Sequence, residues 1–211
     1  MWALVEDNTI TKHLRGNRGI TIGDIQYSRN IFSFRWSNEE REAIGIYEIV
    51  FNNTNKKDEQ WYINTNQSFA FADGVVTASY GSATAKAHAD TLWTQADSDN
   101  GDLPSDKSIG DVKVEGLKTI RIRTVKSQAA GILRDTDWYI VRKADANTAI
   151  PSAITTYRAA VRTKCAAMET AITNASNTPA IETLYTYVNT ADEGDPEVLE
   201  RPLGEWPKLE V

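Results

Sequence analysis

Two helix-forming stretches between Gly116 and Lys164 constrain the fold of this chain more than any other feature. In each stretch the apolar residues recur at steps of three and four, which places them on one side of an α-helix. Two such helices joined by a short connection pack antiparallel, stripe against stripe. We therefore predict a helical hairpin, with an Asp-Thr-Asp-Trp corner and a short loop ending at Ile150-Pro151. The stripes are Ile122, Val125, Ala129, Ile132 and Leu133, and then Ile154, Tyr157, Val161, Cys165, Met168 and Ile172.

The first third of the chain predicts β-structure instead. Asp73-Gly74 separates two β-prone runs, Trp61–Ala72 and Val75–Tyr80, and is a strong signal for a hairpin turn. Glu6-Asp7-Asn8 separates two shorter runs in the same way. Ile20–Ile25 alternates isoleucine with polar residues, which predicts an edge strand.

One short helix is expected within this β-rich part. Ser37 and Glu40 form a capping-box pattern, which predicts a helix from there to Ile44. Gly45 suits the left-handed position that ends such a helix, and Ile46–Phe51 reads as the strand that follows.

These patterns predict an α+β chain in four parts. Residues 1–81 form a small antiparallel β-rich domain, and residues 82–111 a polar linker with one or two helical turns at Ala83–Trp93. Residues 112–190 form a helical domain. Its third helix is capped by Thr178 with Pro179 in the first turn. Residues 191–211 form an extended arm. The third helix would present Ile181, Leu184, Tyr185 and Val188, and the arm would be anchored by Val198, Leu199, Leu203 and Trp206.

Charge is unevenly distributed along the chain. The formal net charge is −6, yet Val112–Cys165 holds 11 Lys and Arg against 4 Asp and Glu, which is +7 and leaves −13 for the rest. Such a basic segment can dock against the chain's own acidic parts or present a solvated face. It can also bind an acidic partner or nucleic acid.

Candidate catalytic and metal-binding residues are scarce. His13 and His88 do not stand at metal-ligand spacing from each other or from Cys165, and Cys165 falls on the apolar stripe of a helix. The run Asp97–Asp102 departs from a calcium loop in the position of its glycine and in lacking the closing glutamate. The sequence predicts no cofactor, no metal and no enzymatic activity.

Other features bear on location and on binding. The first residues lack the basic and apolar parts of a signal peptide, and no apolar run reaches membrane-spanning length, so we expect no membrane partner. A single cysteine suits a reducing compartment. Four aromatic residues could form a binding surface or fill the core of the β-rich part: Trp61, Tyr62, Phe69 and Phe71.

A family resemblance extends this interpretation. Gly131–Trp138, ending in Thr-Asp-Trp, is followed by Ile150-Pro151, then by Tyr157-Arg158-Ala-Ala-Val-Arg162, and the chain closes with Glu205-Trp206-Pro207. Together these resemble the C-terminal domain of tail fibre assembly chaperones and related tail assembly proteins of tailed bacteriophages. The opening MWALVEDNTITK and Ala43–Tyr47 resemble the small β-domain at the start of many such proteins.

The resemblance implies a non-enzymatic protein that binds phage tail fibre or baseplate chains. It would act in the host cytoplasm during phage assembly, with retention in the virion tail left open. A structural virion tail protein or host-recognising fibre-tip protein is the alternative, and a nucleic-acid-binding module is a weaker one. A homo-oligomer is also left open. The residues expected to bind the partner or define the hairpin are Asp137, Trp138, Pro151, Tyr157, Arg158, Arg162 and Trp206.

Three roles follow from the chemistry of these residues. Asp137 can accept from backbone N–H groups at the corner. Trp138 would fill the open end between the two helices. Arg158 and Arg162 lie one helical turn apart, so both could pair with Asp135, Asp137 or Asp145. They would then hold the hairpin, or else grip an acidic segment of the fibre.

Overall fold

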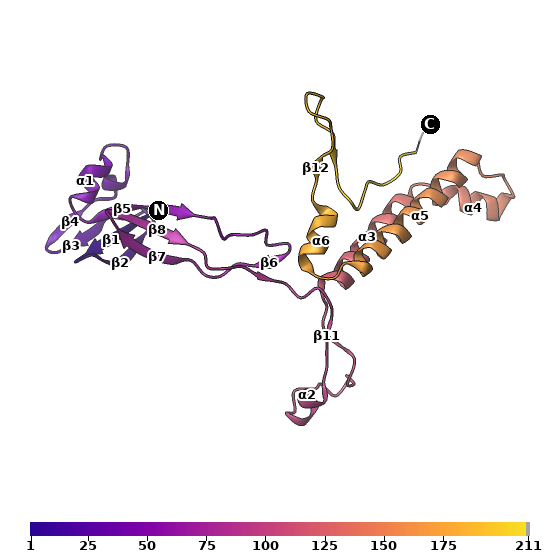
Figure 1. Ribbon diagram of the computed structural model, residues 1–211, viewed down its shortest axis with the longest axis horizontal. Helices are drawn as coiled ribbons and strands as arrows, with labels where there is room; N and C mark the ends of the chain where they lie inside the picture. Colours follow the sequence, from indigo (N-terminus) through magenta and orange to yellow (C-terminus); the bar gives the residue numbers. More distant parts are fainter. Residues whose placement is uncertain (210–211) are drawn as a thin grey trace. The chain divides into compact units, whose positions relative to one another are not determined.

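The computed structural model describes residues 1–209 (Figure 1), and the chain divides into two compact units, Met1–Thr84 and Ala85–Val211. The first unit is rich in strands and the second contains the long helices, which confirms a mixed α+β chain with a strand-rich N-terminal region. In the described residues, no helix combines the length and apolar character needed to cross a membrane.

The first unit is built on a five-stranded sheet in the order β2-β1-β5-β8-β7. All neighbours are antiparallel except β5 and β8, which are parallel. Its two edge strands, β2 and β7, contact each other, and the rings of His13 and Phe69 lie 4.1 Å apart. The strands are β1 (Trp2–Glu6), β2 (Thr9–Leu14), β5 (Ile46–Asn52), β7 (Ser68–Ala72) and β8 (Val75–Ser79).

Both predicted hairpin turns of this sheet are present. Asp73 and Gly74 have φ of 51° and 77°, and Asp7 and Asn8 have φ of 50° and 60°. Positive φ at both central residues matches the twist of the flanking strands, which explains why Asp, Asn and Gly occupy these positions.

Apolar side chains cover both faces of the sheet. Ala3 and Val5 of β1 pack with Ile49, Val76 and Ala78 on one face. Because side chains alternate along a strand, Leu4 faces the other way. It packs there with Ile31 and Ile46.

Short elements complete the first unit, and one of them corrects a prediction. Instead of one edge strand over Ile20–Ile25, β3 (Ile20–Ile22) and β4 (Ile25–Tyr27) form a hairpin, because Gly23 adopts a φ of +56° and reverses the chain. The predicted capping box of Ser37 and Glu40 is confirmed at the start of α1. The remaining elements are η1 (Arg29–Phe32), α1 (Asn38–Glu42) and β6 (Tyr62–Ile63), which pairs with β9 (Thr84–Ala85) where this unit ends.

The segment expected to be a linker is more structured than predicted. The predicted helical turns at Ala83–Trp93 are wrong, since this stretch contributes β9 and β10 (Thr91–Leu92). The helical turn comes later, in α2 (Gln95–Asp99), because Thr94 and Asp97 supply a reciprocal cap there. β10 then pairs with β11 (Val112–Val114) in a two-stranded ladder.

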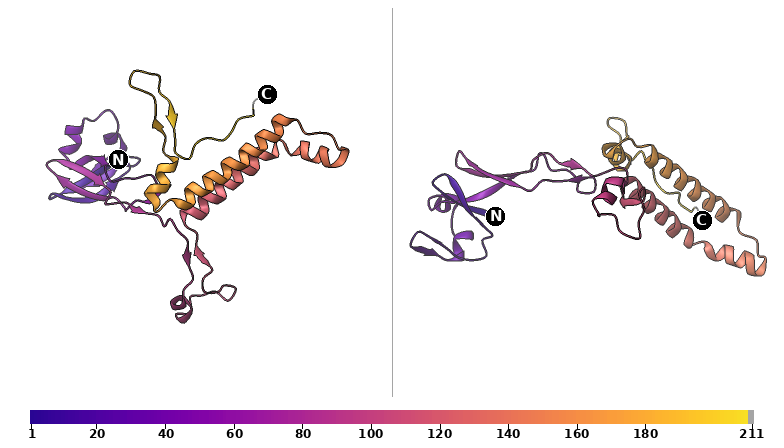
Figure 2. Two further views of the ribbon diagram at one scale, coloured as in Figure 1. Left: turned by 45° about the vertical axis from the view of Figure 1, so that its right-hand side comes forward. Right: turned by 90° about the horizontal axis from the view of Figure 1, so that it is seen from below.

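The helices α3 (Leu117–Arg134) and α5 (Ser152–Asn174) run side by side in both views of Figure 2. Their direction is antiparallel, because Lys118 Nζ donates to Thr173 O (2.8 Å) while Lys126 forms a salt bridge with Glu169 (3.1 Å). Between them Val125, Met168 and Ile172 are buried with Leu203 from the C-terminal segment.

The connection between α3 and α5 is not the predicted short loop. Most of it forms α4 (Asp137–Ala146), which ends where Asn147 adopts a left-handed φ of 54°. Asp137 stands in the first turn of this helix and Lys143 in its last turn, positions that suit the helix dipole.

The C-terminal part also differs in detail from the predictions. Asn177, not Thr178, caps α6 (Thr178–Tyr185), since its side chain accepts from Ala180 N, while the Thr178 hydroxyl is buried and donates to Lys86 O (2.6 Å). Val188 lies beyond the helix in β12 (Val188–Asn189), which pairs with β13 (Leu199–Glu200).

Of the four predicted anchors of the C-terminal arm, two pack against the helices. Leu203 is 4% exposed, and Trp206 is partly buried against the same apolar cluster. Val198 and Leu199 are exposed, because the β12–β13 ladder extends away from the helices (Figure 1).

Candidate interaction surface

Arg158 joins three parts of the α3–α4 junction. Its Nη1 donates to Leu133 O (2.8 Å) and to Thr136 Oγ1 (2.6 Å), and its Nη2 donates to Asp137 Oδ1 (2.8 Å). Thr136 in turn donates its hydroxyl to Leu133 O (2.9 Å). The guanidinium therefore satisfies a carbonyl at the end of α3 and fixes the first turn of α4.

The burial of Arg158 shows that this contact is structural. The residue is 6% exposed, whereas the Asp137 side chain is 54% exposed. A buried cation needs a counter-charge and hydrogen-bond acceptors, and Asp137, Thr136 and Leu133 provide them. Asp137 thus accepts from Arg158 and not from the backbone N–H groups expected at the corner.

The structure separates Arg162 from this cluster. Within residues 1–209 it forms no salt bridge, and its Nη1 donates to the carbonyl of Arg158 at 3.5 Å. The expected pairing of both arginines with the acidic residues of the corner is therefore correct for Arg158 and wrong for Arg162.

Three further predicted residues hold the C-terminal segment or start a helix. Pro151 caps α5. Tyr157 lines a hollow of about 410 Å³ between the first turns of α5 and residues 207–209. Trp206 Nε1 donates to Gln128 Oε1 (3.3 Å) on α3. Tyr157 and Trp206 therefore contact or anchor the C-terminal segment, whereas Pro151 marks the start of α5.

The four aromatic residues of the first unit differ in burial. Trp61 and Tyr62 are 4% and 5% exposed, so their rings are not available to a partner. Phe69 and Phe71 are partly buried against the sheet core, where they remove apolar area from water.

Trp138 faces solvent instead of filling the space between the helices. The residue is 50% exposed, its ring stacks on Tyr139 with centroids 3.8 Å apart, and the Arg142 guanidinium lies 4.6 Å from the Trp138 ring centre. Residues 137–146 form the helix α4 instead of the predicted corner and loop, and in this helix the Trp138 side chain is exposed.

We define the α4 surface as the exposed residues Trp138, Ile140 and Val141 with the basic pair Arg142 and Lys143. Ile140 is 41% exposed and Val141 65%. No residue of α4 is buried. Isolated helices of this length are marginal in water, so α4 exposes apolar side chains without the packing that usually stabilises such a helix.

Two short ladders of the same unit also expose apolar side chains. Such two-stranded ladders are marginal on their own. In Figure 1 both extend away from the helices. The side chains are Leu92, Val112 and Val114 on β10–β11, and Val188 and Leu199 on β12–β13, all between 43% and 57% exposed.

The total exposed area is large for the chain length. The chain exposes 14114 Å². Two separate globular domains of the lengths of these two units would together expose about 11,700 Å². The difference is larger than the roughly 1,600 Å² that a standard protein–protein interface buries. The chain therefore exposes more area than two separate globular domains of these lengths would.

Among residues 1–209 no group of three His, Cys, Asp or Glu side chains could hold a metal ion. Burial and the Glu169 carboxylate raise the pKa of the Cys165 thiol, which makes it a poor nucleophile. The Asp97 carboxylate accepts hydrogen bonds from Lys113 and from Thr94 at the start of α2, and these bonds lower its pKa to about 2.

Comparison of the chain with known protein families, curated proteins and solved structures found no match in any of the three.

The sequence predicts Asp137, Trp138 and Arg158 as site residues but does not predict Ile140 and Val141, because it places them in the loop that ends at Ile150-Pro151. A signal was present, because residues 137–146 contain neither Gly nor Pro, begin with an acid and end before an asparagine.

Proposed function

We propose that this chain is a non-enzymatic tail protein of a tailed bacteriophage, of the fibre-assembly kind, which binds fibre or baseplate chains through its second unit. The resemblance of Gly131–Trp138, Tyr157–Arg162 and Glu205–Pro207 to tail fibre assembly proteins supplies the family. The exposed α4 surface supports a binding role and is the observation on which the proposal depends.

The finer architecture belongs to the same proposal. We interpret α3 and α5 as the helical hairpin of that family, with α4 at its end and residues 203–209 along its side. In this interpretation Arg158 and Asp137 hold α4 in a fixed orientation, so that Trp138 and Val141, which lie one helical turn apart, are presented on one face. A preordered helix loses less conformational entropy when a partner binds.

The chemistry of the α4 surface suggests what the partner offers. Three exposed apolar side chains beside Arg142 and Lys143 fit an apolar patch flanked by carboxylates. Aromatic residues and arginine are enriched where protein interfaces derive most of their binding energy.

The basic character of Val112–Cys165 gives little support to the nucleic-acid alternative. Four of its eleven cations form salt bridges within the chain, namely Lys113, Arg123, Lys126 and Arg158. Arg142 lies over the Trp138 ring. Cations that are already paired release few counterions on binding, so we do not propose nucleic acid as the partner.

A structural virion protein is the second candidate, and the two ladders favour it. A chaperone that leaves its partner must present a surface that tolerates water, whereas a permanent subunit covers its apolar residues in the assembly. Exposed apolar side chains on both β10–β11 and β12–β13 fit permanent burial. Mass spectrometry of purified particles separates the candidates, because a chaperone of the first kind is absent from the virion.

Co-expression tests the proposal. The fibre chain encoded beside this one is produced with the wild-type protein, with Val141→Asp, or alone, and soluble trimeric fibre is measured. We expect Val141→Asp to reduce the yield strongly, because it places a carboxylate in the apolar part of the α4 surface. Ala144→Asp is the matched control, since it adds the same charge to the same exposed helix without removing a large apolar side chain. Equal fibre yields with and without this chain would rule the fibre-assembly function out.

A further inference from the structure

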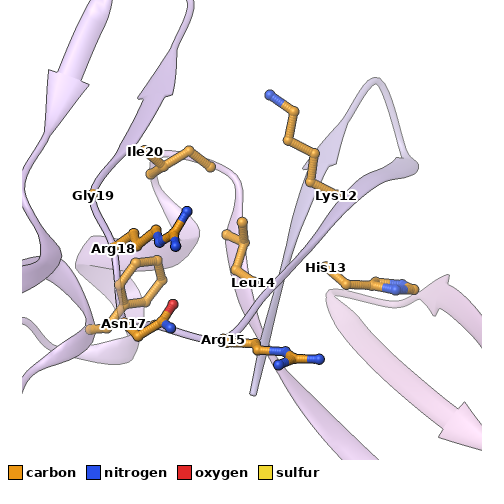
Figure 3. Close-up of a pocket in the computed structure, with 10 residues that line it drawn as sticks. Lys12, His13, Leu14, Arg15, Asn17, Arg18, Gly19 and Ile20 are labelled. Carbon is orange, nitrogen blue, oxygen red and sulfur yellow. The ribbon is translucent and has the colours of Figure 1, made fainter.

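The first unit carries a hollowed basic surface that the proposed function does not use. One hollow of about 420 Å³ is lined by Lys12, Leu14, Arg15, Arg18, Ile20 and Phe32, together with the glycines of the β2–β3 loop. A second hollow adjoins it, shares Arg18 and Gly19, and includes Arg29. In Figure 3, Lys12 and Arg18 stand on either side of Leu14 and Ile20, while His13 and Arg15 point away from them.

The cations of this surface have no partners in the chain. Within residues 1–209, none of the side chains of Lys12, Arg15, Arg18 and Arg29 forms a salt bridge or hydrogen bond. Between Lys12 and Arg29 the sequence holds these four cations and a single acid, Asp24. The surface therefore combines a partly buried apolar floor with uncompensated positive charge.

A segment of the opposite character lies in the second unit. Asn189–Glu200, which forms the turn and return strand of the β12–β13 ladder, contains five acids and no Lys or Arg. The acids are Asp192, Glu193, Asp195, Glu197 and Glu200. None of them forms a salt bridge within residues 1–209, and all are exposed, as are Val198 and Leu199 at 47% and 55%.

The turn that presents these residues is held by its own hydrogen bonds. Asn189 Oδ1 accepts from the backbone N–H of Ala191 (3.1 Å) and of Val198 (3.0 Å). Thr190 N donates to Val198 O (2.8 Å). The segment is therefore preformed, and in its sequence Val198 and Leu199 stand between Glu197 and Glu200.

We propose that the acidic β12–β13 ladder of one copy docks on the basic surface of a second copy of this chain. Carboxylates of the ladder, Glu197 and Glu200 among them, would pair with Lys12 and Arg18, and an apolar side chain of the ladder would cover Leu14 and Ile20. Charge complementarity is the reason for choosing a second copy of this chain as the partner. The same chain supplies both an unpaired basic surface with an apolar floor and an unpaired acidic segment that contains apolar residues.

The two surfaces differ, so the contact is head-to-tail. Each copy keeps one unused surface after it has bound a neighbour, and such contacts build rings when the rotation closes and open filaments when it does not. The inference concerns the chain by itself and does not depend on its acting on a fibre.

Sedimentation of the purified full-length chain tests the proposal. The average mass is expected to rise with protein concentration from the 23.5 kDa of a single chain, and to fall back at high salt. Arg18→Glu is expected to weaken association about tenfold or more, because like charges then face each other. Arg35→Glu is the matched control, since it reverses the charge of an exposed arginine of the same unit outside both hollows.

A mixing experiment then distinguishes a head-to-tail contact from every other arrangement. Arg18→Glu retains an intact acidic ladder, and the double variant Glu197→Gln/Glu200→Gln retains an intact basic surface. Each alone is expected to stay at the mass of one chain, and an equal mixture to form a dimer and nothing larger. The double variant also covers the case in which Arg18→Glu does not fold, because its changes lie in the other unit.

Three results would overturn the proposal: a wild-type chain that remains a monomer at its highest soluble concentration, association that neither variant weakens, and variants that fail to pair on mixing. The proposal would be established if each variant alone fails to associate and an equal mixture of the two variants associates.

Discussion

The Arg158 guanidinium donates to the Asp137 carboxylate at 2.8 Å and so ties the middle of the second unit to the first turn of α4. Asp137→Ala leaves a buried cation without its counter-charge. We expect it to lower the free energy of unfolding by about 2 kcal/mol, less than for a fully buried pair because Asp137 is half exposed. Denaturant titration measures this. Asp135→Ala, two residues earlier and exposed, should change stability by less than about 0.5 kcal/mol.

Two glycines of α3 provide substitutions of opposite sign. Gly131 lies within the helix, and a Cβ there would meet no atom within 4 Å. Gly131→Ala should therefore stabilise the chain by about 0.5–1 kcal/mol. Gly116 occupies the N-cap position of the same helix and lies against the backbone of Ala89 and Asp90. A Cβ at this position would collide with the Ala89 carbonyl.

Gly116→Ala should accordingly destabilise the second unit by about 2 kcal/mol. It displaces a backbone N–H that donates to Asp90 Oδ1 at 2.6 Å. Thermal unfolding of the two variants in parallel measures both effects, and a stabilising Gly116→Ala would show that α3 begins elsewhere.

The carboxylate of Asp97 reports on the β10–β11 ladder. Its hydrogen bond to Lys113, and then those to Thr94, lower its pKa from the ordinary 3.8 to about 2. A depressed pKa in the folded state means that this contribution to stability is present above the unfolded value of 3.8 and is lost as the pH falls towards 2. Carbon-detected NMR titration should show a midpoint near 2, and Lys113→Met should raise it. A wild-type midpoint at the ordinary value would mean that Lys113 does not bind Asp97 in solution.

Cys165 should react slowly with alkylating reagents. Burial raises the pKa of its thiol first, and the thiol's hydrogen bond to Glu169 Oε1 (3.3 Å) raises it further. Glu169→Gln should speed alkylation at a fixed pH, because a larger fraction of the thiol is then ionised. Lys126→Met should slow it, since Lys126 lowers the same pKa. Rates that are equal in all three proteins would mean that access alone controls reactivity.

Local chemistry made much of the first unit predictable from the sequence. Asp73-Gly74 and the Ser37–Glu40 box each act through their own backbone neighbours, so no tertiary information is needed to place them. The parallel pairing of β5 with β8 was not predictable, because residues 53–74, which include β6 and β7, separate the two strands in the sequence. Nor was the hairpin of β3 and β4, whose Gly23 turn interrupts an alternating pattern that looked continuous.

The second unit shows why exposed elements escape detection. The helices α3 and α5 have buried stripes. The helical spacing of Val125 and Ala129 on α3, and of Val161 and Met168 on α5, reflects that burial. The helix α4 has no buried residue, so apolar periodicity carries no information about it. Charge and helical spacing suffice to predict that Arg158 pairs with one of three acids, Asp135, Asp137 or Asp145, of which the structure selects Asp137. The exposure of Trp138 depends on the helical path of the residues around it.

Hydrogen–deuterium exchange at α4, with and without the fibre chain encoded beside this one, tests the proposed function most directly. Residues 137–146 have no buried side chain, so their amides should exchange faster in the free protein than those of α3 and α5. We predict that binding of the fibre chain slows exchange across α4, and that Val141→Asp abolishes this protection while Ala144→Asp retains it. Unchanged exchange at α4 in a complex that demonstrably forms would contradict the assignment of the α4 surface as the binding site.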